Sequence, residues 1–323
     1  MLDARRAIAA FERIGVSSVV LTAGATAALT SVLTMCRLRA SRPVMLCPRP
    51  HFPGYPGLAT LCGFEVVFYP IAQDSDWVRQ LCGLIRKNRP TAILINSPHN
   101  PTGTLTGKKE LARLTACAQR QGAYLVLDES FAGVHPGGGA VPRLGLWPGL
   151  IRLGGFNKRF PCMADVRLGY VLAERSRAVE IAIMHRTLSL GISVAAQKAL
   201  IPLLRDHPRT RLRTLSAEIW QHAEVAGAIL SHCRHLRATP PMAGFFMIIR
   251  LPRTSDPADF ARRLRARSGV WCAASPSFGV VDDQWIRLRL AVSRSQIVRH
   301  ARAIVRLANE RFGRVKNSQT RIL

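Results

Sequence analysis

The sequence predicts an α/β protein, with a mostly parallel sheet of the seven-stranded type covered by helices on both faces and a smaller α+β domain at the C-terminus. Two patterns predict this fold class. Short apolar runs alternate with amphipathic stretches through the first half, and a smaller group of strand-like and helix-like segments follows a long helical region. A chain of 323 residues that is 48% hydrophobic is long and apolar enough for a large buried core.

The strand-like runs of the first half are rich in β-branched and aliphatic residues and too short for helices. They cover residues 43–47, 64–70, 91–96, 123–128, 150–155 and 167–173. The amphipathic stretches, which predict helices, cover residues 25–38, 54–62, 76–88 and 107–121. Strands that alternate with helices are typical of βαβ units, whose parallel strands are covered on both faces.

The second half begins with a helical region. From about residue 175 to 235 the pattern is helical, and it includes a long helix at 210–236 that could link two lobes. Strands are expected at 245–251, 269–273 and 285–291, and helices at 256–267 and 294–309. We therefore predict a large α/β domain over residues 1–208 and a small α+β domain over residues 209–323.

Cysteine spacing and the N-terminal segment predict a cytoplasmic protein. The eight cysteines lie at irregular intervals without a C-x-x-C pair, which argues against a structural zinc site, an iron–sulfur cluster or a disulfide scaffold. We expect no metal site. The N-terminus carries charges throughout and lacks the apolar core of a secretory signal. The uncharged run at 14–36 has too few large apolar residues to insert into a membrane, so we interpret it as buried interior.

The net charge of +27 is the most unusual feature of the composition. It results from 46 basic and 19 acidic residues, and all but six of the basic residues are arginines. Such an excess raises the prospect of nucleic-acid binding. However, the charge is spread along the chain, with no basic tail and no basic stripe interleaved with aromatic residues. We therefore do not expect nucleic acid to be the partner.

Several polar residues follow predicted strands at the point where each strand ends. Asn100 follows the strand at 91–96, Asp128 ends the strand at 123–128, and Lys158 follows the strand at 150–155. In an open parallel sheet, ligands bind beyond the carboxyl ends of the strands. Taken alone, Asn100 and Asp128 could each belong to a turn, and a single lysine among 46 basic residues indicates nothing. Together they predict one crevice lined by an amide, a carboxylate and an amine.

The order of these motifs resembles that of a known family. The series is G-A-T-A-A-L (24–29), P-x-F-P-G-Y (50–55), S-P-H-N-P-T-G (97–103), D-E-S-F (128–131), N-K (157–158), R-L-G-Y (167–170) and W-I-R-L (285–288). It resembles the fold-type I pyridoxal-phosphate enzymes, specifically the class I and II aminotransferases, from about residue 15 to about residue 305. The resemblance implies pyridoxal 5′-phosphate as the cofactor, and an amino acid and a 2-oxo acid as the substrates.

The resemblance assigns a role to each polar residue around the cofactor ring. Lys158 would form a Schiff base with the cofactor aldehyde and later move a proton at the substrate α-carbon. Asp128 would keep the pyridine nitrogen protonated, so that the ring acts as an electron sink. Asn100 would donate a hydrogen bond to the ring 3′-oxygen, and Phe52 would stack on the ring face.

The resemblance also assigns residues that hold anions. The cofactor phosphate would bind the backbone N–H groups of Ala25 and Thr26 at a helix start, with Asn157 and Arg167 beside it. Arg287 in W-I-R-L would bind the substrate α-carboxylate in fork geometry. Its neighbour Arg289 is the alternative candidate for that role.

The sequence departs from the family pattern at several of these positions. Phe131 stands where a tyrosine usually contacts the cofactor oxygen. Gly155 and Asn157 replace residues that are usually serine or threonine in the phosphate cradle. Nine positions, rather than eight, separate Lys158 from Arg167. These departures predict a weaker hold on the cofactor.

The phosphate motif begins at residue 24, so the resemblance implies an N-terminally shortened member of the family. The N-terminal arm that usually closes the site has no counterpart. Neither has the tyrosine that a dimer partner commonly contributes to the phosphate, because the first tyrosine is Tyr55. We nevertheless expect the homodimer that is usual in the family.

Three functional hypotheses follow. We favour an active transaminase. The segment D-E-S-F-A-G-V-H-P (128–136) also resembles threonine-phosphate decarboxylases and some histidinol-phosphate aminotransferases, whose phosphorylated substrates would suit an arginine-rich pocket. The third hypothesis is a catalytically inactive protein with the same fold, and the presence of both Lys158 and Asp128 argues against it.

Overall fold

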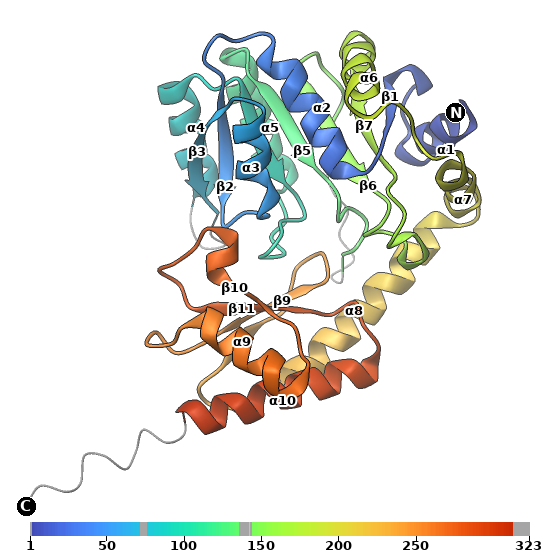
Figure 1. The fold of residues 1–323 in the computed structure, drawn as a ribbon. Coiled ribbons are helices and arrows are strands. Elements are labelled where there is room, and N and C mark those ends of the chain that lie inside the picture. The colour runs from blue at the N-terminus through green and yellow to red at the C-terminus, as the bar shows by residue number, and fades with distance from the viewer. Residues whose placement is uncertain (1, 72–75, 136–141, 143, 313–323) are drawn as a thin grey trace, which may run out of the picture.

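A seven-stranded sheet forms the centre of the upper part of the molecule (Figure 1). The computed structural model describes residues 2–71, 76–135, 142 and 144–312. The strand order is β1-β7-β6-β5-β4-β2-β3. The strands are β1 (Val19–Thr22), β2 (Val44–Arg49), β3 (Glu65–Pro70), β4 (Ala92–Asn96), β5 (Tyr124–Asp128), β6 (Leu150–Gly155) and β7 (Gly169–Ala173). Strand β7 is antiparallel to both neighbours and the other pairs are parallel, which confirms the predicted mostly parallel sheet.

Helices cover both faces of this sheet because its strands alternate apolar side chains between the two faces. On one face, side chains such as Leu94 and Val126 pack against α2 (Ala25–Arg37), α3 (Gly54–Leu61) and α6 (Arg175–Ser189). On the other face, Ile93 and Leu125 pack against α4 (Trp77–Asn88) and α5 (Lys108–Arg120). The helices α1 (Leu2–Glu12) and α7 (Val194–Arg205) pack against each other and cover β1 and β7 on this second face.

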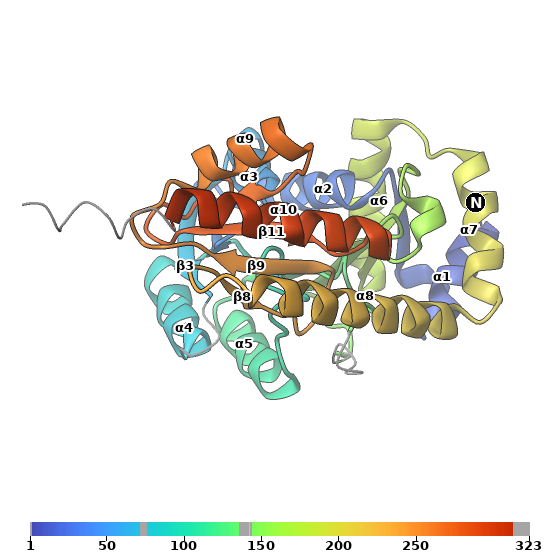
Figure 2. The same ribbon diagram turned by 90° about the horizontal axis from the view of Figure 1, so that it is seen from below.

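A smaller antiparallel sheet lies below the large one, with strand order β10-β11-β9-β8 (Figure 1). Its strands are β8 (Arg237–Thr239), β9 (Phe246–Arg250), β10 (Ala273–Ala274) and β11 (Trp285–Arg289). Figure 2 shows α8 (Pro208–Leu230), α9 (Pro257–Ser268) and α10 (Arg294–Phe312) on its lower face. The opposite face looks toward the carboxyl ends of the large sheet. Short 3₁₀ helices span Val16–Ser18, Pro161–Met163 and Ser275–Phe278.

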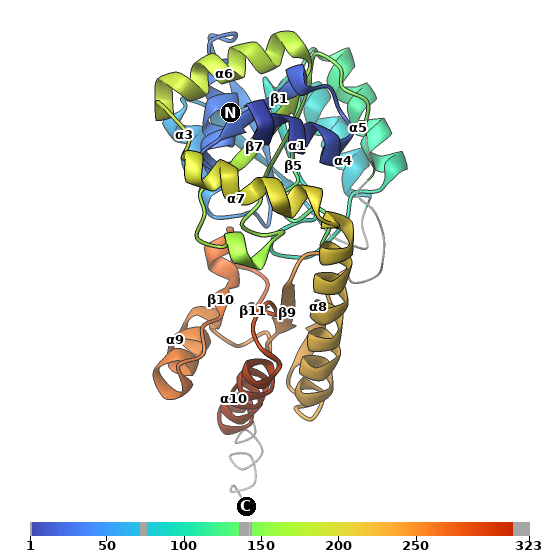
Figure 3. The same ribbon diagram turned by 90° about the vertical axis from the view of Figure 1, so that its right-hand side faces the viewer.

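Helix α8 connects the two sheets, as Figure 3 shows in side view. It begins at Pro208 and ends at Leu230, earlier than the predicted residue 236, because the chain turns at 231–236 to place Cys233 and Leu236 in the core of the small sheet. The division of the chain between residues 208 and 209 stays a prediction. No helix in the described part of the chain has the length and apolarity needed to cross a membrane.

The structure confirms the predicted strands of the large sheet to within two residues at either end, but it corrects two other predictions. Residues 269–273 do not form a strand, because Gly269 ends α9 with a φ of 70° and the strand pairing starts only at Ala273. The uncharged run at 14–36 is only partly interior, since residues 15–17 are exposed, and it contains an unpredicted strand, β1, as well as α2.

A buried cluster of charged side chains joins the N-terminal helix to the centre of the large sheet. Glu12 at the end of α1 accepts hydrogen bonds from Arg159 (2.9 Å), from Arg152 on β6 (3.3 Å) and from the Tyr170 hydroxyl on β7 (2.9 Å). Arg152 also binds both carboxylate oxygens of Glu129, at 2.8 to 3.1 Å. All five residues are buried. Two carboxylates therefore balance two guanidiniums inside the protein.

The charge cluster connects the loop after β5 to the loop after β6. Arg159 directly follows Lys158, and Glu129 directly follows Asp128. A further hydrogen bond of 3.0 Å runs from the Arg159 guanidinium to the backbone oxygen of Glu129. Although burial alone would raise the pKa of Glu12, the guanidiniums of Arg159 and Arg152 lower it overall. The carboxylate of Glu12 is therefore stabilised in its charged form. Its contacts with Arg152 and Arg159 help to fix the relative position of the two loops.

Removal of the Glu12 charge should destabilise the protein strongly. We expect Glu12→Gln to lower the free energy of unfolding by about 3 to 5 kcal/mol, because two buried guanidiniums would then face one carboxylate. Glu218→Gln on the exposed side of α8 serves as the control and should change the free energy of unfolding by less than about 0.5 kcal/mol. Urea unfolding followed by circular dichroism measures both. Equal effects of the two variants would contradict the role assigned to the cluster.

Candidate active site

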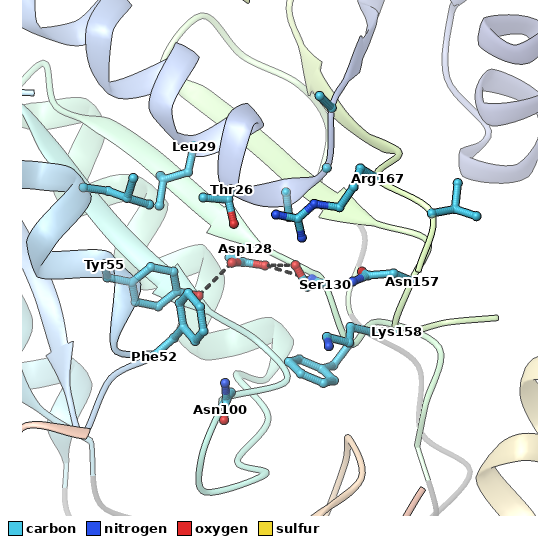
Figure 4. A pocket seen from close by; sticks show the side chains of 16 residues that line it. Thr26, Leu29, Phe52, Tyr55, Asn100, Asp128, Ser130, Asn157, Lys158 and Arg167 are labelled. Atoms are coloured by element: carbon cyan, nitrogen blue, oxygen red, sulfur yellow. Dashed lines mark hydrogen bonds between the residues drawn. The ribbon is translucent and has the colours of Figure 1, made fainter. Parts of the chain in front are cut away.

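A pocket opens at the carboxyl ends of β4, β5 and β6, beside the start of α2 (Figure 4). These strands are neighbours in register, with Asn96 opposite Asp128 and Asp128 opposite Leu153. Eight of the residues predicted from the sequence line this one pocket: Ala25, Thr26, Phe52, Asn100, Asp128, Asn157, Lys158 and Arg167. The ninth, Arg287, reaches toward it from β11.

Asp128 is held in place by three hydrogen-bond donors. The Tyr55 hydroxyl donates to Oδ2 at 2.7 Å. The Ser130 backbone N–H and hydroxyl donate to Oδ1 at 2.9 and 2.6 Å. A buried carboxylate that accepts several hydrogen bonds has a fixed position and a satisfied charge. The Asp128 side chain is therefore a rigid acceptor at the base of the pocket (Figure 4).

Asn100 is oriented by contacts on both sides. Its backbone N–H donates to the Asn96 side-chain oxygen at 2.8 Å, and the Asn96 amide donates to the Asp128 backbone oxygen at 3.0 Å. The Arg287 guanidinium donates to Asn100 Oδ1 at 2.5 Å. Since arginine is a donor only, Asn100 must turn its oxygen toward Arg287. Its amide nitrogen then points into the pocket, as Figure 4 shows.

The start of α2 forms an anion-binding cradle. Gly24, with a φ of 95°, precedes the helix, and the unpaired backbone N–H groups of the first turn give this end a positive partial charge. Gly169 on β7 allows the close approach of this loop, because a Cβ there would lie 2.7 Å from the backbone of Gly24. Arg167 and Asn157 flank the cradle (Figure 4).

His185 on α6 positions the loop that leads into this cradle. Its Nε2 accepts the Ala23 backbone N–H at 3.2 Å, and its Nδ1 lies 3.0 Å from the Ser31 hydroxyl. Because Ser31 donates its own proton to the Ala27 oxygen, the Nδ1–H of His185 is the donor to Ser31. Burial lowers the pKa of His185, which favours this neutral ring.

The comparisons with known proteins agree with this geometry. The family model described as aminotransferase class I and II matches residues 2–304. This match decides the family. The chain belongs to the class I and II aminotransferases. The structure accordingly has the fold of type I pyridoxal-phosphate enzymes, as the sequence predicted.

Individual members of the aminotransferase family are distant relatives. Tyrosine aminotransferase of Mus musculus is 25% identical over 80% of this chain and 60% of its own length. Aspartate aminotransferase of Thermococcus kodakarensis is 25% identical over 90% of this chain and 74% of its own length. The chain spans about 60% of the length of the tyrosine aminotransferases of Mus musculus and Homo sapiens.

Solved aminotransferase structures share the fold at low sequence identity. A methionine aminotransferase from Escherichia coli superposes with a TM-score of 0.84 and 22% identity, covering 95% of this chain and 83% of the other. Aspartate aminotransferase from Thermus thermophilus with maleate gives a TM-score of 0.85 and 21% identity, covering 95% and 82%.

The pocket fits pyridoxal phosphate by the chemistry of its groups. An amine, a buried carboxylate and an amide nitrogen face one space, and an anion cradle opens at the side of it. These groups complement an aldehyde, a pyridinium, a phenolic oxygen and a phosphate respectively. Phe52, which is 38% exposed and stands edge-on to Tyr55, provides an aromatic wall.

The structure gives physical reasons for two departures from the family pattern. The Phe131 ring packs edge-on against Phe245 and Phe246, with ring centres 5.1 and 5.6 Å away, so it joins the small sheet to the pocket. A Cβ at Gly155 would lie 3.1 Å from the Asn157 side-chain oxygen. The glycine therefore leaves room for the Asn157 amide next to Lys158.

Three residues that organise the pocket were not predicted from the sequence as functional. Ser130 had a local signal, since a serine two residues after an aspartate commonly closes a turn on its carboxylate. Tyr55 lies in a motif that the sequence analysis quoted, but nothing near it indicates that its hydroxyl reaches Asp128. His185 is 162 residues from its backbone partner, and no local pattern connects them.

Lys158 stands in a strongly positive environment. Its side chain opens into the pocket. Burial lowers the pKa of the Lys158 ammonium, and the guanidiniums of Arg289, Arg287 and Arg167 lower it further, in that order. Arg287 is itself partly buried between Phe246 and Phe278, with its guanidinium carbon 3.7 and 4.8 Å from the ring centres. Cation–π contact holds it in this position.

The lowered pKa predicts an amine that is reactive at unusually low pH. The ammonium of Lys158 should lose its proton at a lower pH than an ordinary lysine, because its charged form is disfavoured by burial and by three neighbouring cations. The test is competitive labelling of the apoprotein with acetic anhydride, with N-acetyl-lysine amide in the same tube as the reference amine. We expect the pH at which labelling reaches half its maximal rate to be lower for Lys158 than for the reference amine. Arg289→Gln should move the Lys158 midpoint upward. A wild-type midpoint at or above that of the free amine would contradict the electrostatic account.

Proposed function

We propose that this protein is a pyridoxal-phosphate-dependent aminotransferase that moves an amino group from an amino acid to a 2-oxo acid. The observation that carries the proposal is the convergence of Lys158, Asp128 and Asn100 in one pocket from three adjacent strand ends. When bound, pyridoxal phosphate supplies an electron sink for the substrate α-carbon. The remaining steps depend on what the protein side chains hold and move.

Each residue of the pocket has a part in the proposed reaction. Lys158 would anchor the cofactor aldehyde and, once the substrate amine has displaced it, carry a proton to and from the substrate α-carbon. A lowered pKa suits that role, since the amine must be neutral to accept a proton. Asp128 would face the ring nitrogen and stabilise its positive charge, because Tyr55 and Ser130 prevent the carboxylate from turning away.

Two arginines would orient the anionic groups. Arg167 and the start of α2 would bind the cofactor phosphate, with Asn157 beside them. Arg287, fixed by Asn100 and by the two phenylalanine rings, would bind the substrate α-carboxylate. Asn100 would thereby contact both the cofactor and the arginine that holds the substrate.

Replacement of Lys158 tests the proposed role directly. In the wild type, borohydride reduction with pyridoxal phosphate should attach the cofactor covalently to Lys158, as peptide mass spectrometry would show. We expect Lys158→Ala to abolish this attachment and to lower transamination at least 10³-fold, because the proton carrier is lost. Lys198→Ala on the exposed part of α7 is the matched control and should change neither the cofactor attachment at Lys158 nor the transamination rate.

A panel of amino acids separates amino transfer from decarboxylation. The wild-type protein should convert the cofactor to its pyridoxamine form and release a 2-oxo acid. Release of carbon dioxide without that form would favour the decarboxylase hypothesis. Failure of the wild type to attach any cofactor at Lys158 would reject every enzymatic hypothesis at once.

We further propose that the protein acts as a homodimer in the cytoplasm. Support for the dimer comes from apolar side chains that are at least half exposed on α6, directly after α6 and at the start of α7. They are Val179 (54%), Ile183 (55%), Leu188 (50%), Leu190 (89%) and Val194 (62%). A surface of this kind favours burial against a second copy of the chain.

Sedimentation velocity tests the proposed dimer. We expect the wild type to have the molecular mass of two chains, twice the 35.6 kDa of one chain. Ile183→Glu should shift the equilibrium at least tenfold toward the monomer, because it places a charge in the apolar surface. Val281→Glu, which changes a 72% exposed valine on the small domain, is the control. A monomeric wild type at micromolar concentration would contradict this proposal.

A further inference from the structure

A groove lies between helix α1 and the turn that joins α7 to α8 (Figure 3). Its volume is about 720 Å³, within the range of about 300 to 1,000 Å³ that is usual for small-molecule sites. It shares no lining residue with the pocket that contains Lys158. We call it the basic groove, because the charged and titratable residues in its lining are Arg6, Arg13, Arg205, His207 and Arg209.

Small residues of α1 contribute to the concave shape of the basic groove. Ala7 and Ala10 both line it, and residues three positions apart lie on one face of a helix. Arg6 stands beside them on α1, and Arg13 follows directly after the end of this helix. The two short side chains therefore leave an open space that is bordered by long basic ones.

The arginines of the basic groove have few partners within the protein. Arg13, Arg205 and Arg209 are exposed, and their guanidiniums form no ion pair or hydrogen bond with any residue that the structure describes. Arg6 pairs with Asp3 at 3.7 Å, but these side chains are 63% and 68% exposed. An ion pair this exposed contributes little free energy, so Arg6 remains able to bind another anion.

The basic groove also differs from other pockets in its balance of charge. Its described lining contains no carboxylate, because Glu12 turns inward to Arg159 and Asp206 lies outside the lining. Three other pockets each combine their cations with a carboxylate. These carboxylates are Asp128 in the pocket with Lys158, Asp76 in the pocket between α4 and α5, and Asp283 in the pocket beside β9.

Such a surplus of positive charge favours an anionic ligand. A cleft lined by charges of one sign concentrates their electrostatic potential and attracts the opposite charge. The start of α8 adds partial positive charge, since Pro208, Arg209 and Thr210 of its first turn line the groove. Guanidinium groups bind phosphate oxygens through paired hydrogen bonds. A ligand with several phosphate groups would therefore neutralise several of these cations at once.

We propose that the basic groove binds a small ligand that carries two or more linked phosphate groups, such as tripolyphosphate or a nucleoside triphosphate. A single phosphate would reach only some of the cations, because they border the groove from α1 on one side and from the α7–α8 turn on the other. A small ligand is favoured over nucleic acid, since the remaining charge is spread along the chain without a basic stripe interleaved with aromatic residues. This site is separate from the proposed function and does not depend on it.

Calorimetric titration of the full chain with tripolyphosphate tests the site. The protein is first incubated with excess pyridoxal phosphate, so that the anion cradle at the start of α2 is occupied. The buffer contains about 0.15 M salt, at which the Debye length is only about 8 Å. We expect one tripolyphosphate to bind per chain, at least tenfold more tightly than orthophosphate. Absence of saturable binding, or equal affinity for the two anions, would overturn the inference.

A pair of double variants separates the basic groove from the net charge of the protein. Arg13→Gln with Arg209→Gln removes one cation from each side of the groove and should weaken tripolyphosphate binding at least tenfold. Arg86→Gln with Lys87→Gln removes the same charge from exposed positions on α4, at the opposite edge of the large sheet (Figure 1). This control should change the affinity by less than twofold, and circular dichroism should show that both variants fold. Equal losses in the two variants would reject a specific site.

A variant of the other pocket keeps this inference distinct from the proposed function. Arg167→Gln removes a cation beside the α2 cradle and should leave tripolyphosphate binding unchanged, even if no cofactor attaches to Lys158. Loss of the binding in this variant would place the anion in the pocket with Lys158 and overturn the inference.

Two further ligands identify the source of the phosphates. Tighter binding of ATP than of tripolyphosphate would assign the basic groove to an organic polyphosphate, and equal binding would assign it to an inorganic one. Both results support the site. A short DNA duplex that displaces tripolyphosphate and binds more tightly would assign the groove to nucleic acid and overturn the inference.

Discussion

The buried contact between Glu12 and the two arginines Arg152 and Arg159 is the constraint on which the geometry of the pocket depends. Charges in a protein interior persist only where opposite charges and hydrogen bonds compensate them. Here the compensation comes from three separate parts of the chain: the end of α1, the loop after β5 and the strand and loop of β6. Since Asp128 and Lys158 are each one residue away from a member of this cluster, the cluster sets their mutual position.

The pocket above this cluster combines rigid acceptors with exposed cations. Asp128 and Asn100 are buried and oriented by several hydrogen bonds, whereas Lys158 and Arg167 line the pocket with exposed side chains. Rigid groups suit the recognition of a planar cofactor that must keep one orientation. Exposed cations suit anions that enter and leave. The same excess of positive charge also lowers the pKa of the Lys158 ammonium, so in the proposed function one electrostatic feature would serve both anion binding and proton transfer.

Much of this arrangement could be predicted because its signals are local. The parallel strands were predicted from largely apolar runs of five to seven residues, and polar residues lie at or just beyond the ends of several of these runs. The Glu12 cluster could not be predicted in this way. Arg159 lies 147 residues from Glu12, and His185 lies 162 residues from the loop that it supports. Contacts of this kind leave no spacing pattern, and only the fold brings their members together. The pairing of Tyr55 with Asp128, 73 residues apart, was missed for the same reason.

The central claim is that Lys158 and Asp128 act on opposite sides of one cofactor ring. A crystal structure of the protein grown with pyridoxal phosphate tests this claim most directly. The account predicts a covalent link from the Lys158 Nζ to the cofactor, with the ring nitrogen at hydrogen-bond distance from the Asp128 carboxylate. A cofactor joined to another lysine, or a ring nitrogen that faces away from Asp128, would contradict it.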